Sequence, residues 1–297
     1  MKMRKYIIAL LAFVVAFSFA MPALADDDVI DEKYGLPIVV YGDTLSDAQK
    51  EEVRKLLDVT DSSKVQEYNV TGADIANYID GDPHSNMYSS AKIMRQDDSK
   101  GLTINIVTPD NITQVTSDMY ANALLTAGVE GAVVEVASPV KVTGHSALTG
   151  IYKAYDADGD MLDKDRMEVA NEELDVATDL AEKDGLDQEK VTELLAEIKK
   201  AIADQDPATK EDVERIVKEQ LDKLEITLSD EDRQMLTNLF DKMRDLDIDF
   251  DKVKNQLEDI ASSLKDKAGE LGLDEGFWEK VVNFFKNIFN KLSNMFD

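Results

Sequence analysis

A histidine and a serine stand side by side within residues 144–148 (GHSAL), which are similar to the Gly-x-Ser-x-Gly turn that exposes a nucleophilic serine. Leu148 occupies the position where that sharp turn needs its second glycine. A nucleophilic serine also needs a general base, and the sequence has only one further histidine, His84, in a loop that also holds proline and glycine. We therefore expect no catalytic site. If the protein were a serine hydrolase, Ser146 and His145 would be its candidate residues.

A second pair, Ser89 and Lys92, has the Ser-x-x-Lys spacing of penicillin-binding proteins. Both residues fall in a segment that we predict to be a strand. Positions three apart on a strand face opposite sides of the sheet, so the lysine cannot activate the serine there. This pair does not predict an enzyme.

Alternating carboxylates at Asp156, Asp158 and Asp160 resemble the start of a calcium loop, in which oxygen ligands surround a hard cation. Methionines, Met161 and Met167, stand where that loop needs glycine and glutamate. The alternative is a solvated linker turn. We expect no cofactor. If these aspartates did form a metal site, the ion would be Ca²⁺ or Mg²⁺.

Two Val-Thr-Gly elements, ending in Thr71-Gly72 and Thr143-Gly144, each follow an apolar stretch and precede a helical pattern. Free N–H groups and the helix dipole at such a junction can receive an anion. The competing interpretation is structural, since threonine is a common N-cap and glycine permits close packing. We take these four residues as the ligand-binding candidates.

The elements around these residues predict an α/β region over residues 36–155. Strands expected at 38–41, 65–68 and 132–137 alternate with helices near 46–58, 71–79, 113–127 and 143–155. The order β-α-β-α occurs twice, which we interpret as a duplicated unit. Residues 88–95 and 102–107 are also predicted strands, and the polar turn between them predicts a hairpin.

Residues 161–297 form the second region, an acidic one in which apolar residues recur at helical spacing. Asp206-Pro207 is typical of a helix start, and Asp249 is placed to cap another helix. We expect an all-α domain here, built as a bundle or as stacked helical hairpins.

The first 25 residues have the organisation of a secretory signal peptide. Three basic residues precede an apolar run that is shorter than the roughly 20 residues of a spanning helix, and Ala23-x-Ala25 fits signal peptidase. Cleavage after Ala25 takes the formal net charge from −28 to −31. Nucleic acid is an unsuitable partner for so acidic a chain.

The C-terminal residues 277–296 predict an amphipathic helix. Its apolar stripe and local positive charge would suit a membrane surface or a partner protein, although the stripe could instead pack on the preceding helices. The residues that we expect to make this contact are Trp278, Val281, Phe285, Lys286 and Phe289.

Three stretches carry a family resemblance: residues 111–113 (NIT), 120–128 (YANALLTAG) and 142–155 (VTGHSALTGIYKAY). They resemble the YpuA-like secreted proteins of Gram-positive bacteria, which contain a domain of unknown function. The resemblance covers most of the chain and implies secretion, but it brings no activity or catalytic residues.

Together these features predict a secreted, non-enzymatic protein of the cell envelope that binds a ligand or a partner. The alternatives are a wall-acting serine hydrolase that uses Ser146 and an acidic protein that binds divalent cations. The sequence leaves the oligomeric state open.

Overall fold

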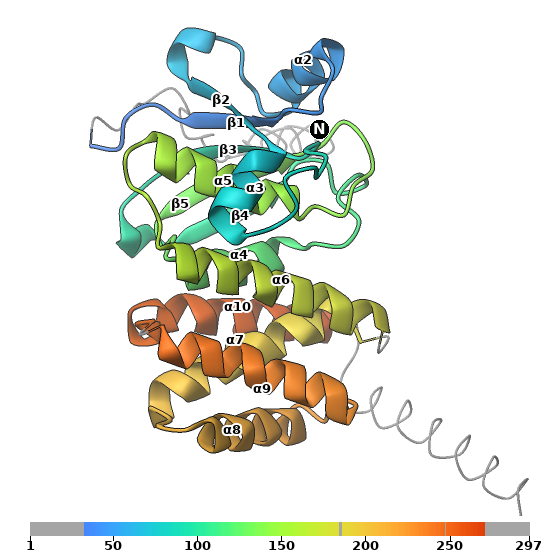
Figure 1. Ribbon diagram of the computed structural model, residues 1–297, viewed down its shortest axis with the longest axis vertical. Helices are drawn as coiled ribbons and strands as arrows, with labels where there is room; N and C mark the ends of the chain where they lie inside the picture. The colour runs from blue at the N-terminus through green and yellow to red at the C-terminus, as the bar shows by residue number, and fades with distance from the viewer. Residues whose placement is uncertain (1–32, 184–185, 247, 271–297) are drawn as a thin grey trace, which may run out of the picture. The chain divides into compact units, whose positions relative to one another are not determined.

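A mixed five-stranded sheet forms the first part of the protein (Figure 1). The computed structural model describes residues 33–183, 186–246 and 248–270. The strands follow the order β2-β1-β3-β5-β4 across the sheet. Their bounds are β1 Ile38–Gly42, β2 Gln66–Val70, β3 Ser90–Arg95, β4 Leu102–Ile106 and β5 Ala132–Ala137.

Helices alternate with these strands and then follow them along the chain. Those of the sheet region are α2 Asp47–Leu56, α3 Gly72–Ile79, α4 Ser117–Ala127 and α5 Ser146–Ala157. Those that follow are α6 Lys164–Lys183, α7 Gln188–Gln205, α8 Lys210–Lys223, α9 Asp230–Asp245 and α10 Phe250–Glu270.

The predicted hairpin of β3 and β4 is wrong, because β5 lies between them. β3 runs antiparallel to β5, with Arg95 opposite Ala132, and β4 runs parallel to β5. The burial of the strands agrees with this order. β5 presents Ala132, Val134 and Val136 fully buried, whereas β4 exposes alternate residues as an edge strand does.

The two faces of the sheet are covered differently. Val40 and Val134 belong to the main core together with α3, α4 and α5, whereas Val39 packs on the other face against Val53 of α2. The chain is thus α/β in this region, and β-α-β-α does occur twice in the order of elements. However, the helices α2 and α4 that connect the paired strands lie on opposite faces of the sheet, so the structure does not confirm the predicted duplication.

The helices from α6 onward share the core of the sheet region. One cluster of buried apolar side chains extends from Ile38 to Ala261 without a break. An ion pair between Glu173 of α6 and Lys199 of α7, both with side chains at most 1% exposed, lies within this packing. The expected boundary at residues 156–160 therefore does not separate two cores.

Candidate ligand pocket

Thr71 is the N-cap of α3, as the structural interpretation predicted. Its hydroxyl accepts a hydrogen bond from the Asp74 N–H at 3.3 Å, and the Asp74 carboxylate accepts one from the Thr71 N–H at 2.8 Å. Gly72 is required by packing, since a Cβ there would lie 2.1 Å from the Pro83 carbonyl oxygen. The protein's own carboxylate thus occupies the position that an anion would take.

Thr143 does not cap a helix, which corrects the expectation of two equivalent helix starts. The chain turns at Gly144, where φ is +113°, and α5 begins only at Ser146, with His145 as an N-cap that makes no side-chain capping bond. The Tyr120 hydroxyl donates to the Gly144 carbonyl at 2.6 Å and fixes this turn. Any ligand role of Thr143 and Gly144 stays a prediction.

The side chain of His145 is directed to α6. Its Nε2 lies 3.3 Å from Thr178 Oγ1 and 3.4 Å from a carboxylate oxygen of Asp175. Burial lowers the pKa of the imidazole, while the nearby carboxylates of Asp179 and Glu182 act against this shift. The His145 side chain thus connects the start of α5 to α6. The structure shows no hydrogen bond between His145 and Ser146.

The three aspartates at 156–160 are paired with other side chains. Tyr78 donates to the Asp156 carboxylate at 2.7 Å. The Arg95 guanidinium contacts Asp158 at 2.7 Å and Asp160 at 2.5 Å. Among the residues that the structure describes, no group of three or more His, Cys, Asp or Glu side chains could hold a metal ion.

Ser89 and Lys92 have separate surroundings. Lys92 lies on the α2 face of the sheet, where its ammonium contacts Glu135 at 2.7 Å and the Leu57 carbonyl at 2.8 Å. Ser89 is fully buried, and its hydroxyl has no hydrogen-bond partner among the described residues.

The membrane or partner contact expected at residues 277–296 lies outside the described residues. This applies to Trp278, Val281, Phe285, Lys286 and Phe289. In the part of the chain that the structure does describe, no helix is long and apolar enough to cross a membrane.

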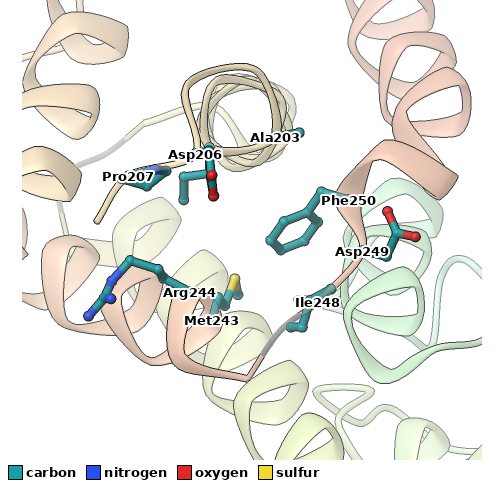
Figure 2. A pocket seen from close by; sticks show the side chains of 9 residues that line it. Ala203, Asp206, Pro207, Met243, Arg244, Ile248, Asp249 and Phe250 are labelled. Atoms are coloured by element: carbon teal, nitrogen blue, oxygen red, sulfur yellow. The ribbon is translucent and has the colours of Figure 1, made fainter. Parts of the chain in front are cut away.

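A pocket of about 530 Å³ opens where the end of α7, the end of α9 and the start of α10 meet (Figure 2). Met243 and Phe250 lie behind this lining, since their side chains are only 0% and 3% exposed. Small-molecule sites are typically about 300–1,000 Å³ with a few polar groups on an apolar lining. The lining residues are Ile202, Ala203, Asp206, Pro207, Met243, Arg244, Ile248, Asp249 and Phe250.

Two charged residues of the lining are already engaged. Arg244 contacts Asp241 and Asp245, each at 2.8 Å, and donates to the Ala208 carbonyl at 3.2 Å. Asp249 caps α10, as predicted, by accepting the Lys252 N–H at 3.2 Å. Figure 2 shows both side chains directed away from the space between Asp206, Met243 and Phe250. Asp206 is therefore the charge that faces the pocket.

Asp206 was expected to start a helix, and this expectation is wrong. It is the C-cap of α7 in the left-handed conformation, with φ at 43°, and Thr209 caps α8 instead. The side chain that the sequence suggested as a helix cap is thereby freed to face the pocket.

Comparison with known proteins assigns the family. The model of a protein family of unknown function, DUF1002, matches residues 41–260. This chain belongs to the DUF1002 family. The uncharacterized protein YpuA of Bacillus subtilis is 36% identical to it over 277 residues, which cover 90% of this chain and 91% of that protein. No solved structure matches the chain.

The expected resemblance to YpuA-like proteins is confirmed by these matches. The DUF1002 match extends from β1 into α10 and so includes every residue that lines the pocket. The pocket residues were missed in the sequence because each has an ordinary structural explanation. Asp206 and Asp249 read as caps, and Met243 and Phe250 read as core.

Proposed function

We propose that this DUF1002 protein is a secreted, non-enzymatic protein of the cell envelope, and that it binds a ligand in the pocket between α7, α9 and α10. The observation that carries the proposal is the pocket itself. It has the volume of a small-molecule site, and the carboxylate of Asp206 is directed into it.

Secretion is supported by residues 1–25, whose basic start, apolar run and Ala23-x-Ala25 ending suit signal peptidase. In this proposal, the amphipathic segment at 277–296 holds the mature protein to a membrane surface or to another envelope protein.

The hydrolase alternative is disfavoured by the contacts of His145. Adjacent residues at a helix start point in different directions, and this imidazole is held at Thr178 and Asp175. The divalent-cation alternative is disfavoured by the contacts of Arg95 and Tyr78, which already satisfy the aspartates of the expected loop.

Two measurements test the proposal. The full chain and a version that ends at Gly276 are produced in a Gram-positive host, and the medium, wall and membrane fractions are compared by mass spectrometry. We expect a mature N-terminus at Asp26, with the full chain in the envelope fraction and the shortened chain in the medium. An uncleaved protein inside the cells would contradict secretion, and equal release of both versions would contradict anchoring.

For binding, a panel of small amines, sugars, carboxylates and phosphates is screened by thermal unfolding against the wild type and Ala203→Phe. Ala203 lines the pocket, so a phenylalanine there should fill it. We expect a panel member to raise the Tm of the wild type and not of the filled variant. A panel that leaves the wild-type Tm unchanged would contradict the proposed ligand pocket.

A further inference from the structure

We propose that the free edge of β4 is a docking site for an extended, positively charged segment of a partner protein, which joins the sheet there as an additional strand. No residue of β4 lines the pocket between α7, α9 and α10. The inference therefore goes beyond the proposed ligand site and is tested independently of it.

The first support is the direction of the backbone groups along β4. The Val107 N–H donates to a carbonyl of β5 at 2.8 Å, so this position faces β5. The Leu102 N–H donates instead to Oε1 of Gln256 at 2.7 Å and faces away from β5. Because these directions alternate along a strand, the N–H and C=O groups of Ile104 and Ile106 also face away from β5.

These outward groups of Ile104 and Ile106 have no hydrogen-bond partner among the residues that the structure describes. An unpaired row of N–H and C=O groups is a template on which another extended chain can form hydrogen bonds. The side chain of Gln256 occupies only the N–H at the start of the strand. A partner strand could therefore pair with the rest of β4 without breaking a hydrogen bond of the described chain.

The two edges of the sheet differ in their protection against such pairing. At the other edge, β2 contains Glu67, which pairs with Arg54 of α2 at 2.6 Å. Lys50 of α2 also donates to Asn69 of β2 at 3.1 Å. Charged residues and proline on an edge strand discourage pairing with another chain. β4 has the sequence LTINI, with neither, so its edge lacks this protection.

The side chains of β4 indicate the pattern that a partner strand should have. Ile104 and Ile106 are partly buried and pack on the main core, whereas Thr103 and Asn105 on the other face are exposed. Neighbours on the same face of paired strands contact each other. The partner segment should therefore alternate apolar residues beside the two isoleucines with polar residues on the other face.

The charge around β4 favours a positive partner over a second copy of this chain. Residues 97–110 contain three aspartates and one lysine, Lys100, which gives them a formal charge of −2. Lys252 of α10 approaches Asp98 at 3.8 Å but lies closer to Glu130, at 2.6 Å. Basic residues near the ends of an added strand would meet this acidic segment. A second copy would bring the same acidic segment, and the net charge of −28 on each chain opposes self-association.

The probe for the test is a capped seven-residue peptide in which valine alternates with threonine between two terminal lysines. It is added to the full chain labelled with ¹⁵N-isoleucine, in which Ile104→Val and Ile106→Val identify the two amide signals. We expect a Kd of about 1 mM or below at low salt. At a peptide concentration about ten times the Kd, hydrogen exchange at Ile104 and Ile106 should slow about tenfold.

Two sets of modified peptides test the pairing and the charge. Methylation of the valine nitrogens or of the threonine nitrogens removes N–H groups from one edge of the peptide. Only one edge can face β4, so one methylated peptide should lose binding and the other should keep it. A twin with glutamate at both ends should bind at least about tenfold more weakly, because attraction at each end becomes repulsion.

A matched pair of variants tests the strand in the protein. Ile104→Pro removes an outward N–H of β4 and should raise the Kd at least about tenfold. The Gln66 N–H faces β1, where it donates to the Pro37 carbonyl, so the N–H of Asn69 faces away from β1. Asn69→Pro thus makes the same change at the edge of β2 and should keep the wild-type Kd.

The inference is overturned if the lysine peptide does not bind, if its glutamate twin binds as tightly, or if the two methylated peptides behave alike. It is also overturned if light scattering shows a wild-type dimer that Ile104→Pro dissociates, because a second copy would then occupy β4. If Ile104→Pro does not fold, the methylated peptides decide, since their binding is measured on the wild-type chain.

Discussion

The most deeply buried charges in the described structure are those of Glu173 and Lys199. Their oxygen and nitrogen lie 2.5 Å apart. The Lys199 ammonium also donates to the carbonyl and the side-chain oxygen of Asn122 at 2.8 and 2.9 Å, and Thr126 donates to Glu173 at 2.6 Å. Burial lowers the pKa of this lysine, while the ion pair with Glu173 acts against the shift. The network joins α6 and α7 to α4 beneath the sheet.

We expect Lys199→Met to lower the free energy of unfolding by about 3–5 kcal/mol, because it leaves the Glu173 carboxylate buried without its cation. Adding Glu173→Gln should restore most of that loss, because no unpaired charge remains. Urea unfolding measures both. The control is Lys242→Met, which removes a half-exposed partner of Glu172 and should cost less than about 1 kcal/mol. Equal effects of the two lysine substitutions would contradict this account.

Asp175 should make stability depend on pH in the direction opposite to an ordinary carboxylate. Partial burial, followed by the charges of Asp179 and Glu172, raises the pKa of Asp175 to about 6, while a bond from Asn171 opposes the shift. The folded protein thus holds a proton that the unfolded chain releases, so this group contributes stability below about pH 4 that is lost as the pH rises through 6. His145 faces the same carboxylate, and burial lowers the pKa of its imidazole.

We expect Asp175→Asn to stabilise the protein at pH 7.5, by less than about 1 kcal/mol because the side chain is 56% exposed. The gain should shrink as the pH is lowered from 7.5 to 4.5. Thermal unfolding across this range measures it. A gain that is the same at both ends, or a loss at pH 7.5, would refute the assignment.

At the scale of elements, the two Val-Thr-Gly segments differ although their sequences match. Thr71 caps α3, whereas Thr143 lies on an exposed turn three residues before α5. Thr71→Ala should therefore lower the free energy of unfolding by about 1 kcal/mol. Thr143→Ala should stay within about 0.5 kcal/mol of the wild type. Chemical denaturation compares the pair, and similar losses in both variants would restore the expectation of equivalent helix starts.

The strand order can be tested with cysteine pairs, because the native chain has no cysteine. Met94 of β3 lies opposite Val133 of β5, and Thr103 of β4 lies on the far side of Val133. Neighbouring strands are about 4.8 Å apart, so Met94→Cys with Val133→Cys should form a disulfide, and Met94→Cys with Thr103→Cys should not. Mass spectrometry after mild oxidation distinguishes them. The reverse result would indicate the hairpin that the sequence suggested.

Local signals predicted the elements better than they predicted their partners. Apolar alternation and caps such as Asp249 marked where strands and helices lie, because those signals act over a few residues. The pairing of β3 with β5 depends on which strand is more completely buried, which no turn between Arg95 and Leu102 can encode. For the same reason the pocket was missed, since Asp206, Met243 and Phe250 come together only through the packing of α7, α9 and α10.

At the scale of the whole molecule, the described residues from Leu36 onward cluster as one compact unit. The core that begins under the sheet continues into the helices, and the buried pair of Glu173 and Lys199 lies in it. The pocket lies in the helical part of this unit. It does not include Thr71 or Thr143, which we predicted from the sequence to bind a ligand. A ligand bound there would contact three helices and stabilise their packing.

The central claim is that the pocket between α7, α9 and α10 binds a ligand. The most direct measurement is an NMR titration of the chain with ¹³C-labelled methionine methyl groups, in which Met243→Leu identifies the signal of Met243, a residue of the pocket lining. On addition of the panel of small amines, sugars, carboxylates and phosphates, we predict that one member shifts the Met243 resonance progressively to saturation in the wild type and not in Ala203→Phe at the same concentrations. A Met243 signal that no member moves, or that moves equally in the two proteins, would contradict the claim.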